Sequence, residues 1–324
     1  MQTNAKKIID NRTIWLLFGL CWFVYFISYI GRMNYSAAMP DMIASFWLTM
    51  QQAGSLSTAF FVCYAAGQFI NGLLADQTKP ENLIFIGLGL SSFVNFFMPL
   101  APSYFFALAL WALNGYALSM LWPSIIRIIA DMFEARTMIK CGVHIASSMA
   151  AGSLSAYLLA SLLIRFIGWQ AVFFVAFVLL LTICIIWHIL FKNIKKRREK
   201  YGVTQLAEQE KIISPATVHK KNFTKYLFGS GIFILLLPVA VHGAIKDGVT
   251  AWIPTMLTQT FAAPAYAAVL AVSLLPIVNL SGAYMANYLF KWVKNEILCA
   301  SVFFTLALVG ISGIIFLDSS TTFM

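Results

Sequence analysis

The residues of this sequence that point most directly to chemistry are two cations within long apolar stretches, Arg32 and Lys246. Each is followed by a small hydroxyl residue four positions later (Ser36 and Thr250), by a proline eight positions later and by a methionine ten positions later. A charge inside a lipid bilayer is costly, so an intramembrane cation indicates a functional site. Because the two cations occupy the same frame of a repeated unit, we expect them to form one site that binds an anion.

Further polar side chains accompany these cations. Tyr29 and Tyr35 belong to a polar and aromatic stripe on the face of the first cation, which favours a wet cavity over lipid. His242 lies one turn before the second cation. His144 lies in the middle of another apolar stretch, where a histidine is rare and can bind an anion or carry a proton. We expect all four residues to contribute to substrate binding.

Simpler interpretations of the cations remain open. An arginine near the end of a span can extend its head group to the membrane surface, although the helical pattern continues beyond Arg32 for two more turns to Pro40. Asp247 follows Lys246 directly. Adjacent residues on a helix need not pair. Asp247 either neutralises Lys246 locally, or it faces elsewhere or exchanges partners during transport.

The sequence has no motif of an enzyme or an ATP-driven pump. It contains no GxxxxGK(S/T) phosphate-binding loop, no nucleophile–base pair and no cluster of metal-ligand residues. Its 5 cysteines lie in or beside apolar stretches without a CxxC pair, as polarizable residues of a packed interior do. We expect no catalytic residue, no metal ion and no cofactor.

Composition predicts a membrane protein. Of the 324 residues, 60% are hydrophobic and 10% are charged, whereas soluble proteins carry about 25% charged residues. The apolar stretches are long enough to cross a bilayer as helices and too long for membrane β-strands. The first one is also too long for a signal peptide. The sequence predicts an all-α membrane protein of the helical-bundle type with spans at residues 14–38, 52–74, 83–101, 103–130, 141–164, 169–191, 226–257, 264–290 and 297–317.

The distribution of positive charge predicts the orientation of these spans. The net charge is +10, and 18 of the 22 Lys and Arg residues fall in alternate connections, ten of them in the segment after the sixth span. Only Arg165 lies in an opposite connection. This bias places the N-terminus and the long middle segment in the cytoplasm. Membrane topology therefore accounts for the charge, and we expect a lipid bilayer but no nucleic acid as a partner.

The long polar segment divides the chain into unequal parts. We expect a six-helix bundle at residues 1–192, a basic cytoplasmic linker at 193–225, and a partial bundle of about three spans at 226–324. Internally repeated halves are typical of secondary transporters. Since an architecture of two equal bundles would need three further helices, we interpret the chain as truncated, with a genuine nine-span protein as the alternative.

Four motifs resemble those of a known family: GRMNYSAAMP in the first span, GLLADQTKPENL after the second, LWPSIIRIIADMF at the end of the fourth and AWIPTM after the second cation. They are similar to motifs of the major facilitator superfamily, and most of all to its organophosphate:inorganic phosphate antiporters, the glycerol-3-phosphate and hexose-6-phosphate carriers. The resemblance covers nearly the whole chain. It implies a bundle of helices that works by alternating access.

The resemblance also implies roles for the site residues. In that family, arginines of the first and seventh spans hold the substrate phosphate, and a histidine of the fifth span contributes. Arg32 matches the first arginine, while Lys246 stands in the second place and lacks the planar, two-point grip of a guanidinium. His144 lies about one turn from the matching position, near Met149. The basic residue that often follows the first arginine is replaced by Met33.

The sequence also predicts a cytoplasmic gate. Gly72 permits a close approach of helices, and Asp76 lies at the cytoplasmic end of the second span, where Arg127 at the end of the fourth could meet it. Asp131 lies four residues after Arg127, so a local ion pair within one helix is the alternative.

These observations together predict the function. We expect a monomeric secondary transporter of the inner membrane that exchanges a sugar phosphate or glycerol phosphate for inorganic phosphate. The first alternative is a symporter for carboxylates such as hexuronates, because the signature of the first span also resembles organic anion:cation symporters. The others are a non-transporting membrane sensor and an inactive fragment of the same fold.

Overall fold

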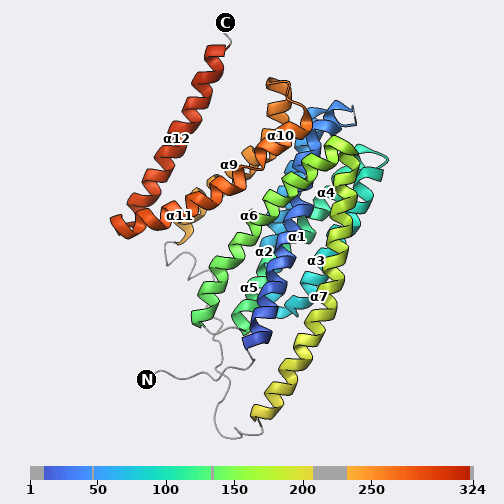
Figure 1. The fold of residues 1–324 in the computed structure, drawn as a ribbon, viewed down its shortest axis with the longest axis vertical. Helices are drawn as coiled ribbons and strands as arrows, with labels where there is room; N and C mark the ends of the chain where they lie inside the picture. The colour runs from blue at the N-terminus through green and yellow to red at the C-terminus, as the bar shows by residue number, and fades with distance from the viewer. Residues whose placement is uncertain (1–10, 46, 133–134, 207–231, 322–324) are drawn as a thin grey trace. The chain divides into compact units, whose positions relative to one another are not determined.

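The computed structural model of the chain describes residues 11–45, 47–132, 135–206 and 232–321. All regular elements of these ranges are helices, which confirms the predicted all-α class (Figure 1). In chain order they are α1 (Asn11–Ala44), α2 (Met50–Gln77), α3 (Pro80–Phe97), the short 3-10 helix η1 (Met98–Leu100), α4 (Tyr104–Ser119), α5 (Leu121–Met132), α6 (Ala135–Phe166), α7 (Trp169–Leu206), α9 (Ile232–Thr260), α10 (Ala265–Val272), α11 (Leu275–Val293) and α12 (Glu296–Thr321).

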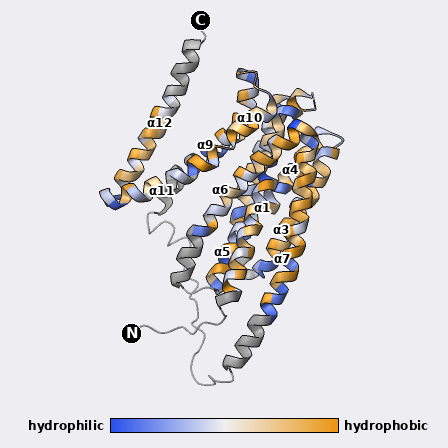
Figure 2. Cartoon of the chain, in the orientation of Figure 1, coloured by the Kyte–Doolittle hydropathy of each residue, from blue (hydrophilic) through white to orange (hydrophobic). Residues whose placement is uncertain are grey.

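Within the described residues, six helical segments are long and apolar enough to cross a membrane, and Figure 2 shows hydrophobic residues along much of their length. They coincide with the six spans predicted before the linker, so the six-span N-terminal half is confirmed. Helices α9 to α12 fall on the three later predicted spans. The six segments are Thr13–Ala44, Met50–Leu74, Pro80–Leu100, Tyr104–Asp131, Ser147–Phe166 and Trp169–Lys196.

Two predicted spans are interrupted by a turn, and in each case a proline follows the turn. The fourth span divides into α4 and α5 at Met120, just before Pro123, and the eighth divides into α10 and α11 at Ser273, just before Pro276. Proline has no amide hydrogen, and its ring clashes with the carbonyl four residues earlier. The regular hydrogen-bond pattern therefore stops at these two positions, which the sequence analysis did not anticipate.

Close packing within the first six spans depends on glycines at helix crossings. Helix α2 packs against α4, and α1 packs against α6 and α7. A Cβ atom on Gly115 of α4 would collide with the carbonyl oxygen of Phe60 in α2, and one on Gly152 of α6 would collide with that of Phe26 in α1. Small residues allow such backbone contacts between membrane helices. These two glycines thus fix how closely α2 and α1 approach their neighbours.

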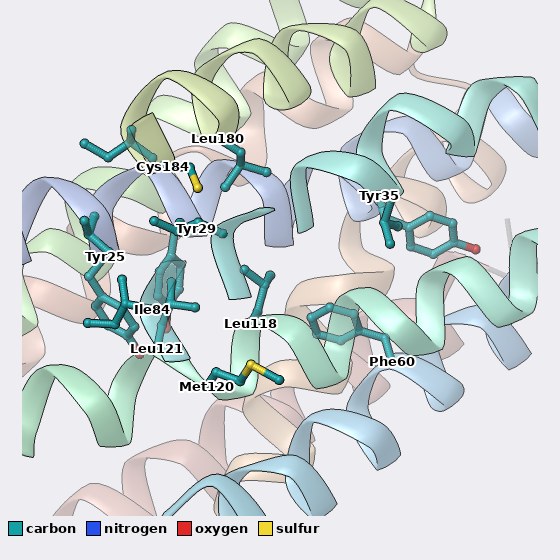
Figure 3. Close-up of a cluster of buried hydrophobic side chains, with 14 of the residues drawn as sticks. Tyr25, Tyr29, Tyr35, Phe60, Ile84, Leu118, Met120, Leu121, Leu180 and Cys184 are labelled. Atoms are coloured by element: carbon teal, nitrogen blue, oxygen red, sulfur yellow. The ribbon is translucent and has the colours of Figure 1, made fainter. Parts of the chain in front are cut away.

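The interior of this bundle is apolar and rich in aromatic rings. Figure 3 shows part of it, with Tyr25 and Tyr29 of α1 close to Ile84 of α3 and Leu121 of α5. Among the described residues, the largest fully buried side chains are Trp111 of α4 and Trp187 of α7. Dense packing of this kind holds α1 in one rotational setting, which decides where the polar residues of α1 point.

The chain divides into two compact units, Met1–Leu275 and Pro276–Met324. The first contains the six spans together with α9 and α10, since α9 packs against α1 and α10 packs against α6. The described part of the predicted linker continues α7 to Leu206. Residues 207–231 lie outside the described ranges, so the domain boundaries drawn from the sequence stay predictions.

The second unit consists of most of α11 together with α12. Lys294 has a φ of 51°, in the left-handed region, and it directly follows the end of α11. The Asn295 side chain accepts a hydrogen bond from the Leu298 amide at 3.1 Å and so caps the start of α12.

Candidate functional site

A small, partly open cavity lies between α1, α2, α4 and α9. Its walls combine aromatic rings with a few polar groups, as ligand sites in proteins do. Arg32 and Asp247 are the two charged residues of the lining. The full lining consists of Arg32, Met33, Tyr35, Ser36, Ser57, Phe60, Phe61, Trp111, Asp247, Thr250 and Ala251.

Arg32 projects from the middle of α1 and is nearly buried, with 10% of its side chain exposed. Its Nη2 donates a hydrogen bond to Oδ2 of Asp247 on α9 at 3.0 Å. Its Nε is buried and has no hydrogen-bond partner among the described residues. A guanidinium donates through a fixed planar fork, so Arg32 keeps a donor free beside the cavity.

Aromatic rings surround the Arg32 guanidinium. Its central carbon lies 4.6 Å from the ring centroid of Tyr64 and 5.4 Å from that of Tyr29. The rings of Phe60 and Phe61 lie at 6.0 Å. Aromatic faces attract a cation within about 6 Å, most strongly where water is excluded. These rings stabilise a charge that the membrane interior would otherwise destabilise.

Lys246 and Asp247 are consecutive residues of α9, the helix that pairs with Arg32 of α1. Lys246 is about half exposed and is not part of the cavity lining, and its Nζ lies 3.8 Å from Oδ1 of Asp247. Asp247 therefore contacts both cations, each through a different oxygen. The structure combines local contact with Lys246 and a long-range ion pair with Arg32.

The two similar segments that begin at Arg32 and at Lys246 lie next to each other. The Ser36 hydroxyl of α1 donates to the Ala251 carbonyl of α9 at 2.9 Å and lies 3.4 Å from the Thr250 carbonyl. Pro254 has no amide hydrogen to offer the Thr250 carbonyl four residues earlier. Pro254 therefore leaves the Thr250 carbonyl without its helical hydrogen bond, and the Ser36 hydroxyl of α1 lies against that carbonyl.

A buried polar network sets the position of α1 on either side of Arg32. The Asn114 side chain of α4 donates to the Gly31 carbonyl at 3.0 Å, and Asn34 of α1 donates to Asn95 of α3 at 2.5 Å. Ser91 of α3 closes the network by donating to Asn114 at 2.7 Å. Satisfied polar networks in a low-dielectric interior favour one arrangement. This one fixes the turn of α1 that carries Arg32.

The other predicted binding residues differ in their placement. Tyr29 contacts Arg32 as described, and Tyr35 lines the cavity, with its hydroxyl donating to the Ala53 carbonyl at 2.8 Å. His144 lies exposed on α6 and is not part of the cavity lining. The side chain of His242 lies outside the described residues. Tyr29 and Tyr35 are thus brought to the site, whereas His144 is not.

The predicted gate residues are not brought together among the described side chains. A Cβ atom on Gly72 would meet no atom of the described residues within 4 Å, so the gating role of Gly72 stays a prediction. Arg127 pairs with Asp131 of its own helix at 2.9 Å, as the alternative stated. The side chain of Asp76 lies outside the described residues.

Comparison with known proteins agrees with this architecture. Residues 21–324 match the family model of the Major Facilitator Superfamily. The chain belongs to the major facilitator superfamily. It is accordingly a multi-pass membrane protein of the transporter type, and the resemblance inferred from the motifs is confirmed.

Two curated relatives carry informative descriptions. A probable hexose phosphate transport protein of Chlamydia muridarum is 21% identical over 292 residues, which cover 84% of this chain and 63% of the relative. The membrane sensor protein UhpC of Salmonella typhimurium is 32% identical over 95 residues, or 29% of this chain and 22% of the relative. The chain spans between 61% and 63% of the length of the first relatives that it matches.

A solved structure supports the fold independently. A bacterial homologue of the human lysosomal transporter Spinster, in an inward-facing and occupied conformation, superposes with a TM-score of 0.68. The alignment covers 89% of this chain and 63% of the other, at 15% sequence identity. At this identity, the similarity establishes the helical arrangement of the superfamily.

Proposed function

We propose that this chain is a secondary transporter of small organic anions and that Arg32 and Lys246 bind the anion. The observation that carries the proposal is the buried Arg32 guanidinium, which lines a cavity and keeps an unpartnered Nε beside it. A phosphate or carboxylate accepts two parallel hydrogen bonds from such a group. Lys246 adds a second, more exposed positive charge, which lies 3.8 Å from the carboxylate of Asp247, the ion-pair partner of Arg32.

The first choice of substrate is a sugar phosphate or glycerol phosphate that is exchanged for inorganic phosphate. The relative described as a probable hexose phosphate transport protein supports this choice. Transport would occur by alternating access in the cytoplasmic membrane, with the N-terminus inside, in agreement with the charge distribution of the sequence. We propose that one chain holds one complete site, so that a monomer suffices.

Contacts between α6 and α10 fit a carrier that is closed at one end. Ser161 of α6 donates to the Tyr266 carbonyl at 2.7 Å, and the Arg165 guanidinium lies 5.2 Å from the Tyr266 ring centroid. Both pairs lie near the end of the bundle at which α6 ends (Figure 1). With the proposed orientation, this is the external end, and opening it requires these contacts to break.

A membrane sensor is the second candidate, and it is favoured by the 32% identity to the sensor protein UhpC over 95 residues. A sensor and a transporter would share the anion site. They differ in whether the bound anion crosses the membrane, so binding and flux have to be measured together.

The test is exchange in liposomes that contain the purified chain and are loaded with phosphate. Labelled phosphate is supplied outside, with glucose 6-phosphate or glucuronate as competitors. The proposal predicts phosphate exchange that glucose 6-phosphate inhibits more strongly than glucuronate. Stronger inhibition by glucuronate would favour the carboxylate symporter. Binding of glucose 6-phosphate without flux would favour the sensor, and neither binding nor flux would contradict both.

A further inference from the structure

We propose that Asp247 is a tethered anion that fills the binding site of the empty carrier, so that this chain carries out net transport of its substrate besides exchange. The inference rests on the proposed transport function and goes beyond it. Strict exchange requires only the loaded carrier to change state. Net transport also requires the empty carrier to do so.

Asp247 occupies the place between the two cations in which an anionic substrate would be held. Its Oδ2 accepts from Arg32 at 3.0 Å, and its Oδ1 lies 3.8 Å from the Lys246 ammonium. Among the residues that line the cavity, Arg32 is the one cation and Asp247 the one acid. The lining therefore carries no net charge when no substrate is bound.

This neutralisation matters when the cavity closes. A carrier that changes state passes through forms in which its site is shielded from water. A cation that is buried without a partner is strongly destabilised, and removing one partner of a buried pair is costly for this reason. Arg32 is already 90% buried by its surroundings, as its exposed fraction of 10% shows. With Asp247 as its partner, the empty carrier can close around it.

The substrate must nevertheless be able to displace Asp247, and the geometry gives it an advantage. Asp247 uses one guanidinium nitrogen, Nη2, while Nε stays without a partner. An incoming phosphate or carboxylate can bind both nitrogens, and bidentate pairs are stronger than single ones. One third of the Asp247 side chain is exposed, and Lys246 lies next to it. The displaced carboxylate thus keeps a cation within reach.

A purely structural role for Asp247, as a tie between α1 and α9, makes a different prediction. The two helices are also joined by the hydrogen bond from Ser36 to the Ala251 carbonyl and by direct packing. If Asp247 served only to hold them, its neutralisation would lower exchange and net transport together. If Asp247 is a tethered anion, the two activities separate.

The experiment compares two kinds of liposome containing the purified full chain, with the membrane potential clamped. Labelled phosphate uptake is measured into vesicles loaded with phosphate, which reports exchange, and into vesicles without internal phosphate, which reports net transport. The variants are Asp247→Asn, which removes the charge, and Asp247→Glu, which keeps it. Glu81→Gln is the matched control, because Glu81 pairs with Lys195 at 3.3 Å outside the cavity.

We expect the unaltered chain to show both activities. Asp247→Asn should lose about tenfold or more of net transport while exchange changes by less than about threefold. It should also bind phosphate more tightly, because the internal competitor is gone. Glu81→Gln should keep both activities, and Asp247→Glu, which retains the charge, should recover net transport relative to Asp247→Asn.

Each contrary result leads to a different conclusion. Exchange without net transport in the unaltered chain overturns the inference and leaves the proposed function standing. Parallel loss of both activities in Asp247→Asn also overturns it and assigns Asp247 the structural role. Absence of phosphate exchange in the unaltered chain removes the proposed phosphate transport together with the inference that rests on it.

Discussion

Nη2 of Arg32 in the first span lies 3.0 Å from Oδ2 of Asp247 in α9, 215 residues later in the chain. This ion pair joins the six-span bundle to the first helix after the linker. Both residues line the cavity, and the buried Nε of Arg32 has no partner among the described residues. The ion pair therefore joins α1 and α9 at the place where we propose that the anion binds.

The second cation differs from the first in a way that can be measured. Lys246 offers a single movable charge, whereas an arginine there would offer a planar pair of donors. We expect Lys246→Arg to lower the KM for phosphate in exchange by about tenfold, since a charge-assisted bidentate contact adds about 1.5–3 kcal/mol.

Lys195→Arg is the matched control for this change, because Lys195 pairs with Glu81 away from the cavity. Its KM should stay as in the unaltered chain. An unchanged or higher KM in Lys246→Arg, with normal exchange at saturating phosphate, would argue against a contact between Lys246 and the anion.

The polar network around Arg32 should contribute to stability as well as position. In Asn95→Ala, the Asn34 amide loses its acceptor in the bundle interior, and an unsatisfied buried donor costs about 1–3 kcal/mol. We expect a lower midpoint of thermal denaturation in detergent, together with a raised KM for phosphate, because α1 loses the bond that fixes its Arg32 turn.

Ser92→Ala serves as the comparison, since Ser92 is buried on the same helix and donates a single bond to the Phe177 carbonyl at 3.1 Å. It should lower the denaturation midpoint less and leave the KM unchanged. Equal effects of the two substitutions on KM would show that the network does not position Arg32.

Gly152 tests the close contact between α1 and α6. A Cβ atom there would meet the Phe26 carbonyl oxygen and would lie 2.8 Å from Cβ of Tyr29. Gly152→Ala should therefore lower the denaturation midpoint, despite the higher helix propensity of alanine of about 1 kcal/mol. Gly89→Ala, whose Cβ would meet only Sγ of Cys184 at 4.0 Å, should raise the midpoint or leave it unchanged. The reverse order would contradict the packing described for α6.

The sequence predicts much of the fold because its signals are local. Length and apolarity determine the six spans, and the repeated frames mark Arg32 and Lys246 as related. The breaks before Pro123 and Pro276 carry an equally local signal, which the span predictions overlooked. By contrast, the role of Gly72 depends on what lies opposite it, and no local pattern contains that information.

The site was only partly predictable for the same reason. Phe60, Phe61 and Tyr64 surround Arg32, but their pattern on α2 does not distinguish them from Phe69, which is 65% exposed. The sequence neighbour Lys246 is the obvious partner of Asp247, whereas its ion pair with Arg32 joins residues 215 positions apart. The available signal was the Asp itself, because an acid in an apolar stretch needs a cationic partner.

The most direct test of the central claim is phosphate exchange in liposomes by the Arg32→Ala variant, measured beside the unaltered chain and a Glu81→Gln control. Loss of the guanidinium removes the one cation of the cavity lining. The account predicts that exchange at subsaturating phosphate falls by about 100-fold, consistent with two charge-assisted hydrogen bonds, while the control keeps its rate. Exchange by Arg32→Ala at the rate of the control would contradict the assignment of Arg32 as the anion-binding residue.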